Sequence, residues 1–118
     1  MAKSKNINLN KVDEMAEGDA GFRAELLQAL YTSIQDLQAK YLEGLSSRNE
    51  EALQQARHKI KPTVALFQLT GIQTVLQEGK TIITSQGFAA LGDHERQFRQ
   101  ATDDLLEELE QVMGGQTS

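Results

Sequence analysis

The sequence predicts an all-α protein, an antiparallel up-down four-helix bundle with a short extra helix at its N-terminus. Composition is the first observation behind this prediction. The chain is rich in Leu, Ala, Glu and Gln, has 5% aromatic residues, no Trp and one Pro, and so favours helices over strands. Periodicity is the second, because apolar residues recur at three- and four-residue steps in four long segments. Four such amphipathic helices with short connections pack most readily as an antiparallel bundle.

Size and composition indicate a single domain over residues 1–118, which we expect in the cytoplasm. A chain of 118 residues and 13.1 kDa can bury one modest core. The absence of Cys excludes disulfides and thiolate metal sites and suits a reducing compartment. There is no long apolar run for a membrane span, and the first residues lack the apolar core of a signal peptide. A net charge of -5 argues against general nucleic-acid binding.

The first third of the chain predicts a short helix followed by a long one. Residues 1–8 are polar, and we expect no regular structure there. Asn10 is expected to cap a short helix that ends near Met15. Asp19 is expected to cap the first long helix, and Gly44 to close it. The apolar stripe of this long helix comprises Phe22, Leu26, Leu27, Leu30, Ile34, Leu37, Tyr41 and Leu42.

The second long helix contains the only proline. Ser47 and Glu50 match a capping box and predict its start. Pro62 lacks an N–H and disfavours helical geometry at the residue before it, so one helix could stop there and another begin. We favour one kinked helix, because the apolar stripe runs in phase from Leu53 to Phe67.

Two further helices are predicted in the last part of the chain. Thr70–Gln73 matches a capping box and opens the third long helix, Gly79 is a small residue that a neighbour could approach closely, and Gly87 ends the helix. Asp93 is expected to cap the last helix, which should fray from Gly114. The apolar stripes comprise Ile72, Val75, Leu76, Ile82 and Ile83 in the third helix, and Phe98, Ala101, Leu105, Leu109 and Val112 in the last.

His58 is the candidate functional residue. A turn of about 100° per residue gathers Ala52, Leu53, Ala56, Ile60, Thr63, Val64 and Phe67 on one side of the second long helix, and Glu51, Gln54, Gln55, His58, Lys61, Pro62 and Ala65 on the other. His58 therefore lies near the centre of the polar face. Arg57, Lys59 and Lys61 flank it with positive charge in an acidic chain. A solvated imidazole in such a patch can accept and hold a phosphoryl group.

This pattern resembles the histidine-containing phosphotransfer (HPt) domain family, whose usual run is His-x-Leu-Lys-Gly-Ser with a later Gly and an apolar residue. The matching places hold His58, Ile60, Lys61 and Thr63, with Leu69 as the later apolar residue. Pro62 and Gln68 depart from the pattern, since each stands where Gly is usual. The resemblance covers about residues 19–113.

The resemblance implies a stand-alone relay protein that carries phosphoryl between receiver-domain aspartates through phospho-His58. Lys61, one turn along the helix, would stabilise the phosphoryl charge. The partners would be response-regulator receivers or hybrid sensor kinases, with Mg²⁺ supplied by the receiver, no cofactor or metal in this chain and no kinase activity of its own. We expect a monomer. The docking surface would comprise Gln54, Gln55, Arg57, Lys59, Pro62 and Ala65.

One further role implied by the family lacks its usual residue. A Gln or Glu twenty-two residues after the histidine often accepts a hydrogen bond from its ring, but Lys80 occupies that place, which leaves the role vacant or open to a residue such as Glu78. The alternative function is therefore a bundle that binds a receiver or kinase, as adaptor or inhibitor, without transferring phosphate. The second histidine, His94, lies between Asp93 and Glu95, and we expect it on the surface. No pair of histidines is spaced for a di-iron site, and no Gly-rich phosphate loop is present.

Overall fold

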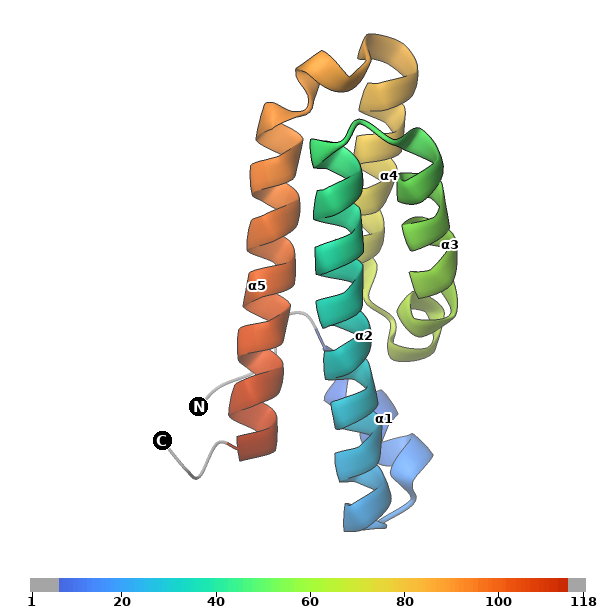
Figure 1. The fold of residues 1–118 in the computed structure, drawn as a ribbon. Helices are drawn as coiled ribbons and strands as arrows, with labels where there is room; N and C mark the ends of the chain where they lie inside the picture. The colour runs from blue at the N-terminus through green and yellow to red at the C-terminus, as the bar shows by residue number, and fades with distance from the viewer. Residues whose placement is uncertain (1–6, 115–118) are drawn as a thin grey trace.

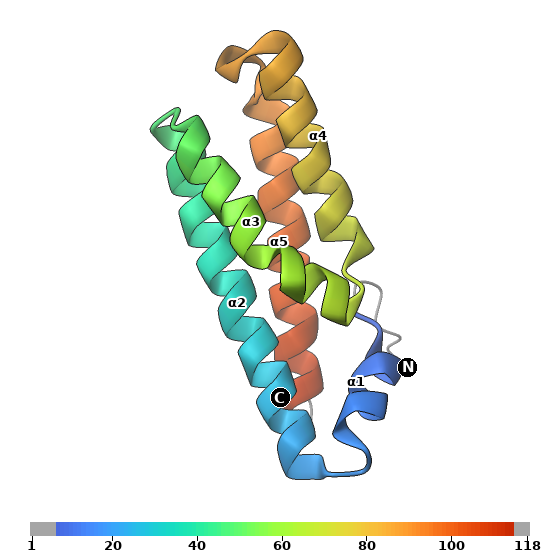
Figure 2. The ribbon, with the colours of Figure 1, turned by 90° about the vertical axis from the view of Figure 1, so that its right-hand side faces the viewer.

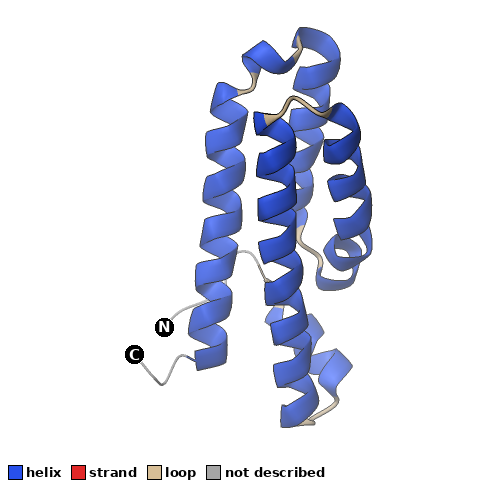
Figure 3. Ribbon diagram, viewed as in Figure 1, coloured by secondary structure: helices blue, strands red, loops and turns tan. Residues whose placement is uncertain are grey.

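The computed structural model of the chain describes residues 7–114, and every regular element in that range is helical (Figures 1 and 3). The elements are α1 (Leu9–Ala16), α2 (Ala20–Ser46), α3 (Glu50–Phe67), α4 (Thr70–Gln86), the 3₁₀ turn η1 (Phe88–Ala90) and α5 (Gly92–Gly114). The all-α prediction is confirmed, as is the short helix before the long ones. No helix in residues 7–114 has the length and apolar character needed to cross a membrane.

The helix α2 organises the bundle because it packs against α1, α3 and α5 (Figures 1 and 2). It has 27 residues, whereas α3 has 18 and α4 has 17. At 1.5 Å per residue, the two shorter helices cannot follow α2 along its full length. The short helix α1 packs against α2 at the end that they leave uncovered (Figure 2).

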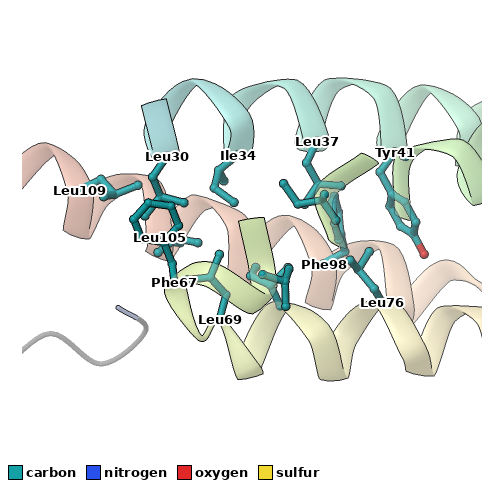
Figure 4. Packing of buried hydrophobic residues seen from close by; sticks show 14 of the residues in the cluster. Leu30, Ile34, Leu37, Tyr41, Phe67, Leu69, Leu76, Phe98, Leu105 and Leu109 are labelled. Atoms are coloured by element: carbon teal, nitrogen blue, oxygen red, sulfur yellow. The ribbon is translucent and has the colours of Figure 1, made fainter. Parts of the chain in front are cut away.

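One continuous core joins all five α-helices. Each long helix contributes its apolar stripe, and most of the fully buried side chains come from α2 and α5 (Figure 4). Fully burying a side chain of this size stabilises a fold by about 1.5–3 kcal/mol. Ile7 and Val12 belong to the same core, with exposed fractions of 5% and 0%. Ile7 is therefore ordered and buried, contrary to expectation, while residues 1–6 lie outside the described range.

Two helices start at a different cap from the one expected. Asn8, and not Asn10, caps α1, because its Oδ1 accepts a hydrogen bond from the amide three residues on. Asn49, and not Ser47, caps α3 in the same way. The Ser47 hydroxyl instead donates to the carbonyl of Glu43 in the last turn of α2. In both places two good capping residues compete, and the turn before the helix selects between them.

Of the other predicted caps, one is confirmed and two are wrong. Asp19 caps α2 through a bond from the Phe22 amide, as predicted. Thr70 does not cap α4, because Leu69 occupies the cap position and makes no side-chain bond there. Asp93 lies inside α5, which begins at Gly92.

Glycines end some helices and serve packing in others. Gly87 ends α4 with a φ of +85°, as predicted. Gly44 does not end α2, which continues to Ser46. It is buried, and a Cβ on it would press against Leu53 of α3. Its small size therefore allows α2 and α3 to approach each other.

The helix α3 is continuous from Glu50 through Pro62 to Phe67, so the two-helix alternative is wrong. Buried residues on both sides of Pro62, including Ile60 and Val64, anchor it to the core. The helix ends at Phe67, and the following residue, Gln68, caps it with a φ of +56°. This left-handed conformation suits Gly, which is the usual residue at this place in the HPt pattern.

Candidate functional site

His58 lies on the exposed face of α3, as the helical pattern predicted. The buried residues Ile60 and Val64 hold the opposite face of the helix in the core, with exposed fractions of 4% and 8%. A rigid helix thus presents the imidazole to solvent, where a large partner can reach it. No hydrogen bond to this ring occurs within residues 7–114, so neither Lys80 nor Glu78 fills the role of its hydrogen-bond acceptor.

Most of the expected docking residues share this face. The side chains of Gln54, Gln55, Lys59, Pro62 and Ala65 are exposed around His58. Leu66 belongs with them but was not predicted. It is 46% exposed, and its position eight residues after His58 places it about 80° from the histidine around the helix. The sequence does hold a sign of this, because Leu66 is a large apolar residue outside the buried stripe of α3. We call the surface formed by His58, Gln54, Gln55, Lys59, Pro62, Ala65 and Leu66 the His58 face. It therefore includes an apolar part.

Lys59 is tied to the neighbouring helix. Its Nζ lies 3.1 Å from Oδ2 of Asp36 on α2, and the other oxygen of Asp36 lies 3.3 Å from Nζ of Lys40. The hydrogen bond from Lys59 is the main cause that lowers the pKa of the Asp36 carboxyl, with a smaller contribution from Lys40. Lys59 and Gln55 also border a groove of about 500 Å³ between α2 and α3. Lys59 is thus paired with Asp36, a carboxylate that it shares with Lys40.

Lys61 is exposed on α3 and makes no ion pair within residues 7–114. Residues three apart on a helix share a face, so its ammonium can reach a group attached to the His58 ring. Of the cations that flank His58, this one is both on the same face and uncompensated.

Arg57, also expected on the docking surface, is less exposed than the other residues expected there. Its side chain is half-buried, and Nη1 is enclosed without a hydrogen-bond partner among the described residues. The guanidinium lies beside the hydroxyl of Tyr41. Burial raises the pKa of that hydroxyl, and the Arg57 charge partly offsets the rise. Residue 57 lies about 100° from His58 on the side of α3 away from Lys59, and there its guanidinium turns toward Tyr41.

His94 was expected on the surface, and this expectation is wrong. It is 1% exposed, and its Nε2 lies 2.8 Å from the hydroxyl oxygen of Tyr41. The two rings meet edge to face with centroids 5.7 Å apart. Burial lowers the pKa of His94. The charge of Glu78 raises it and that of Arg57 lowers it further, each by less than burial does.

A four-residue step explains why His94 faces inward. It precedes Phe98, which is fully buried, by four residues and so continues the apolar stripe of α5 toward its N-terminus. The acidic neighbours Asp93 and Glu95 indicated a surface position for His94 and so led to the wrong prediction. Space for the ring comes from Gly79 of α4, because a Cβ there would overlap both the His94 ring and the Tyr41 hydroxyl. The prediction that a neighbour approaches Gly79 closely is confirmed.

Neither a metal-binding cluster in the described part of the chain nor a known relative suggests a function. Among residues 7–114, no cluster of His, Asp or Glu side chains is arranged to hold a metal ion. Comparisons with protein-family models, with curated proteins and with solved structures gave no match. A functional assignment therefore depends on the His58 face itself.

Proposed function

We propose that this chain is a stand-alone histidine phosphotransfer protein, which relays a phosphoryl group between receiver-domain aspartates through phospho-His58. The observation that carries the proposal is an exposed imidazole at the centre of the polar face of α3, with the uncompensated Lys61 one turn away. The match of His58, Ile60, Lys61 and Thr63 to the HPt pattern supports it. We further propose that α2 to α5 form the antiparallel up-down four-helix bundle of that family, and that the protein acts as a cytoplasmic monomer.

The transfer step needs little from this chain beyond access and charge. A neutral imidazole nitrogen attacks the phosphorus of an aspartyl phosphate on the receiver. The N–P bond forms as the P–O bond to the aspartate breaks, and the carboxylate leaves. Lys61 offsets negative charge on the transferring oxygens, and Mg²⁺ held by the receiver does the same from the other side. The reverse reaction passes the group to a second receiver.

The His58 face also suits protein docking. Pro62, Ala65 and Leu66 provide an apolar area on the C-terminal side of the histidine, while Gln54, Gln55 and Lys59 provide polar groups nearer the start of α3. Protein interfaces combine apolar and polar contacts in this way. The partner in this proposal is a receiver domain.

A second candidate is an adaptor or inhibitor that binds a receiver or kinase without transferring phosphate. The observation in its favour is that the His58 ring has no hydrogen-bond acceptor among residues 7–114 to orient it. Both candidates use the same surface and differ in whether a covalent bond forms.

A labelling experiment tests the proposal and separates the two candidates. A receiver domain phosphorylated with ³²P is mixed with the wild-type chain, with His58→Gln and, as a matched control, with His94→Gln. We expect label on the wild type and on the His94 variant but not on the His58 variant. The labelled product should be labile in acid and stable in base. Binding without label in every sample would favour the adaptor, and label on His58→Gln would refute His58 as the acceptor.

A further inference from the structure

A buried polar cluster lies inside the apolar core and connects four helices. Tyr41 comes from α2, His94 from α5 and Arg57 from α3, and Gly79 of α4 packs against the first two. Tyr41 and His94 have exposed fractions of 0% and 1%. The Tyr41 ring also stacks on Phe98, with centroids 4.3 Å apart. Water cannot reach this pair to compensate a change of charge.

The hydrogen bonding of His94 suits only a neutral ring. Nε2 faces the Tyr41 hydroxyl, whereas Nδ1 is buried with no hydrogen-bond partner among the described residues. A neutral imidazole has one donor and one acceptor nitrogen, so the Tyr41 hydroxyl can satisfy Nε2 in either tautomer. A protonated ring has two donors, and the second would find no acceptor. Leaving a charged donor buried in this way is costly.

The charges that face His94 from the packed helices act in opposite directions, and both affect its pKa less than burial does. Arg57 of α3 brings a cation to the same cluster, while Glu78 of α4 offers the opposite charge from an exposed position. Tyr41 of α2 is uncharged near neutral pH, as an ordinary tyrosine is, and burial raises its pKa further. His94 is the third residue of α5, where the helix dipole disfavours positive charge. The adjacent carboxylates on α5 are paired on the surface, Asp93 with Arg96 and Glu95 with Arg99.

We propose that the Tyr41–His94 pair is a proton-sensitive latch, which holds α5 against α2 and α4 while His94 is neutral and releases them when it is protonated. The direction in which stability changes with pH follows from the linkage between protonation and folding. Burial lowers the pKa of His94 in the folded chain below its unfolded value of about 6.5, so the folded state binds fewer protons. The stability that the neutral ring contributes is therefore complete above about pH 6.5 and is lost as the pH falls toward the lowered folded-state pKa. This proposal does not depend on phosphotransfer.

Urea unfolding between pH 8 and pH 5 tests the latch. The wild type is compared with His94→Gln, whose amide can still reach Tyr41 but does not titrate. All carboxylates titrate in both proteins, so their contribution cancels in the comparison. We expect the unfolding midpoint of the wild type to fall more than that of the variant on going from pH 8 to pH 5. Parallel falls in the two proteins would overturn the proposal.

Two further variants should change the acid-induced fall of the unfolding midpoint in opposite directions. Arg57→Met removes the opposing cation and should reduce the acid-induced fall of the midpoint, whereas Glu78→Gln removes the favourable charge and should increase it. If His94→Gln does not fold, NMR titration of the wild type decides, with the two histidine signals assigned by means of His58→Ala. We expect the His94 ring to stay neutral at pH 6.5 and below while the fold is intact. Protonation of His94 at or above pH 6.5 in the folded protein would refute the latch.

Discussion

The ammonium of Lys59 lies 3.1 Å from Oδ2 of Asp36, which ties one of the cations beside His58 to α2. Lys61 has no such partner within residues 7–114. Two lysines that look equivalent in the sequence therefore differ in their electrostatic surroundings. Only Lys61 offers a charge that is free to follow a phosphoryl group.

Replacing Lys61 separates a role in transfer from a role in docking. Lys61→Gln keeps most of the stem and removes the charge. If Lys61 stabilises the transferring phosphoryl, its loss should affect the transition state more than the complex. We expect the transfer rate at saturating receiver to fall by about tenfold or more, with a much smaller change in affinity, in rapid-quench and calorimetric measurements.

Lys59→Gln is the matched control for this prediction, since it removes the lysine that is paired with Asp36. We expect a smaller effect on the saturated rate than for Lys61→Gln. Equal effects of the two substitutions would mean that the site responds to net charge alone. A loss of affinity with an unchanged rate for Lys61→Gln would make it a docking residue.

Stability should depend on one face of α3 and not on the other. Ile60 and Phe67 are each 4% exposed, and truncating either to Ala should cost about 2–5 kcal/mol of unfolding free energy. His58→Ala removes an exposed side chain and should change it by about 0.5 kcal/mol or less. Urea denaturation of the three variants measures these changes in unfolding free energy. A large loss for His58→Ala would contradict the exposed position of the imidazole.

Gly79→Ala should destabilise the protein although Ala is the better helix former. The added Cβ would overlap the ring of His94 and the hydroxyl of Tyr41, and overpacking of this kind typically costs about 1–3 kcal/mol. Gly21→Ala in the first turn of α2 is the control, because its Cβ meets only ordinary contact with Asp19. There the better helix propensity should leave stability unchanged or raise it by up to about 1 kcal/mol. Thermal unfolding that ranks the two variants in the opposite order would refute the close packing at Gly79.

Gln68→Gly should stabilise the end of α3. Gln68 has a φ of +56°, and a left-handed backbone costs a residue with a Cβ about 1–2 kcal/mol. The substitution loses the exposed hydrogen bond from Asn8 Nδ2 to Gln68 Oε1, so we expect a net gain of about 1 kcal/mol or less.

Gln68→Ala loses the same hydrogen bond but keeps the backbone cost, so its difference from Gln68→Gly isolates the conformational effect. Denaturant titration of the two variants measures that difference. A Gly variant no more stable than the Ala variant would show that the left-handed turn carries no cost.

The helices themselves could be predicted from the sequence, whereas several of their ends could not. A stripe such as Leu53 to Phe67 is a signal repeated over many residues, and it carries the helix through Pro62. A cap depends on one residue, and Asn49 and Ser47 both qualify. The choice between them depends on Arg48, whose φ of +53° turns the chain between α2 and α3. A left-handed conformation is uncommon for Arg, so the local sequence does not indicate this turn.

In the candidate site, likewise, the positions of some side chains could be predicted from the sequence and those of others could not. The exposure of His58 and Lys61 followed from helical periodicity, because both lie far from the buried stripe. Arg57 lies at the edge of the α3 stripe, and His94 continues the α5 stripe but lies between two acidic residues that indicated a surface position. Tyr41 receives both of them, and its own position in the α2 stripe gave no sign of these polar contacts.

The short helix α1 gives the molecule unequal resistance to local opening. Its polar links to the rest of the chain, Asn8 to Gln68 and Asp13 to Arg23, are exposed and so contribute little. Val12 and Ala16 provide most of its attachment. Backbone amides of α1 should therefore exchange with deuterium through a partial opening, before those of α2 and α5 that are protected until the whole core unfolds. The end of the protein remote from the Tyr41–His94 pair would then behave as a separate, weaker cooperative unit.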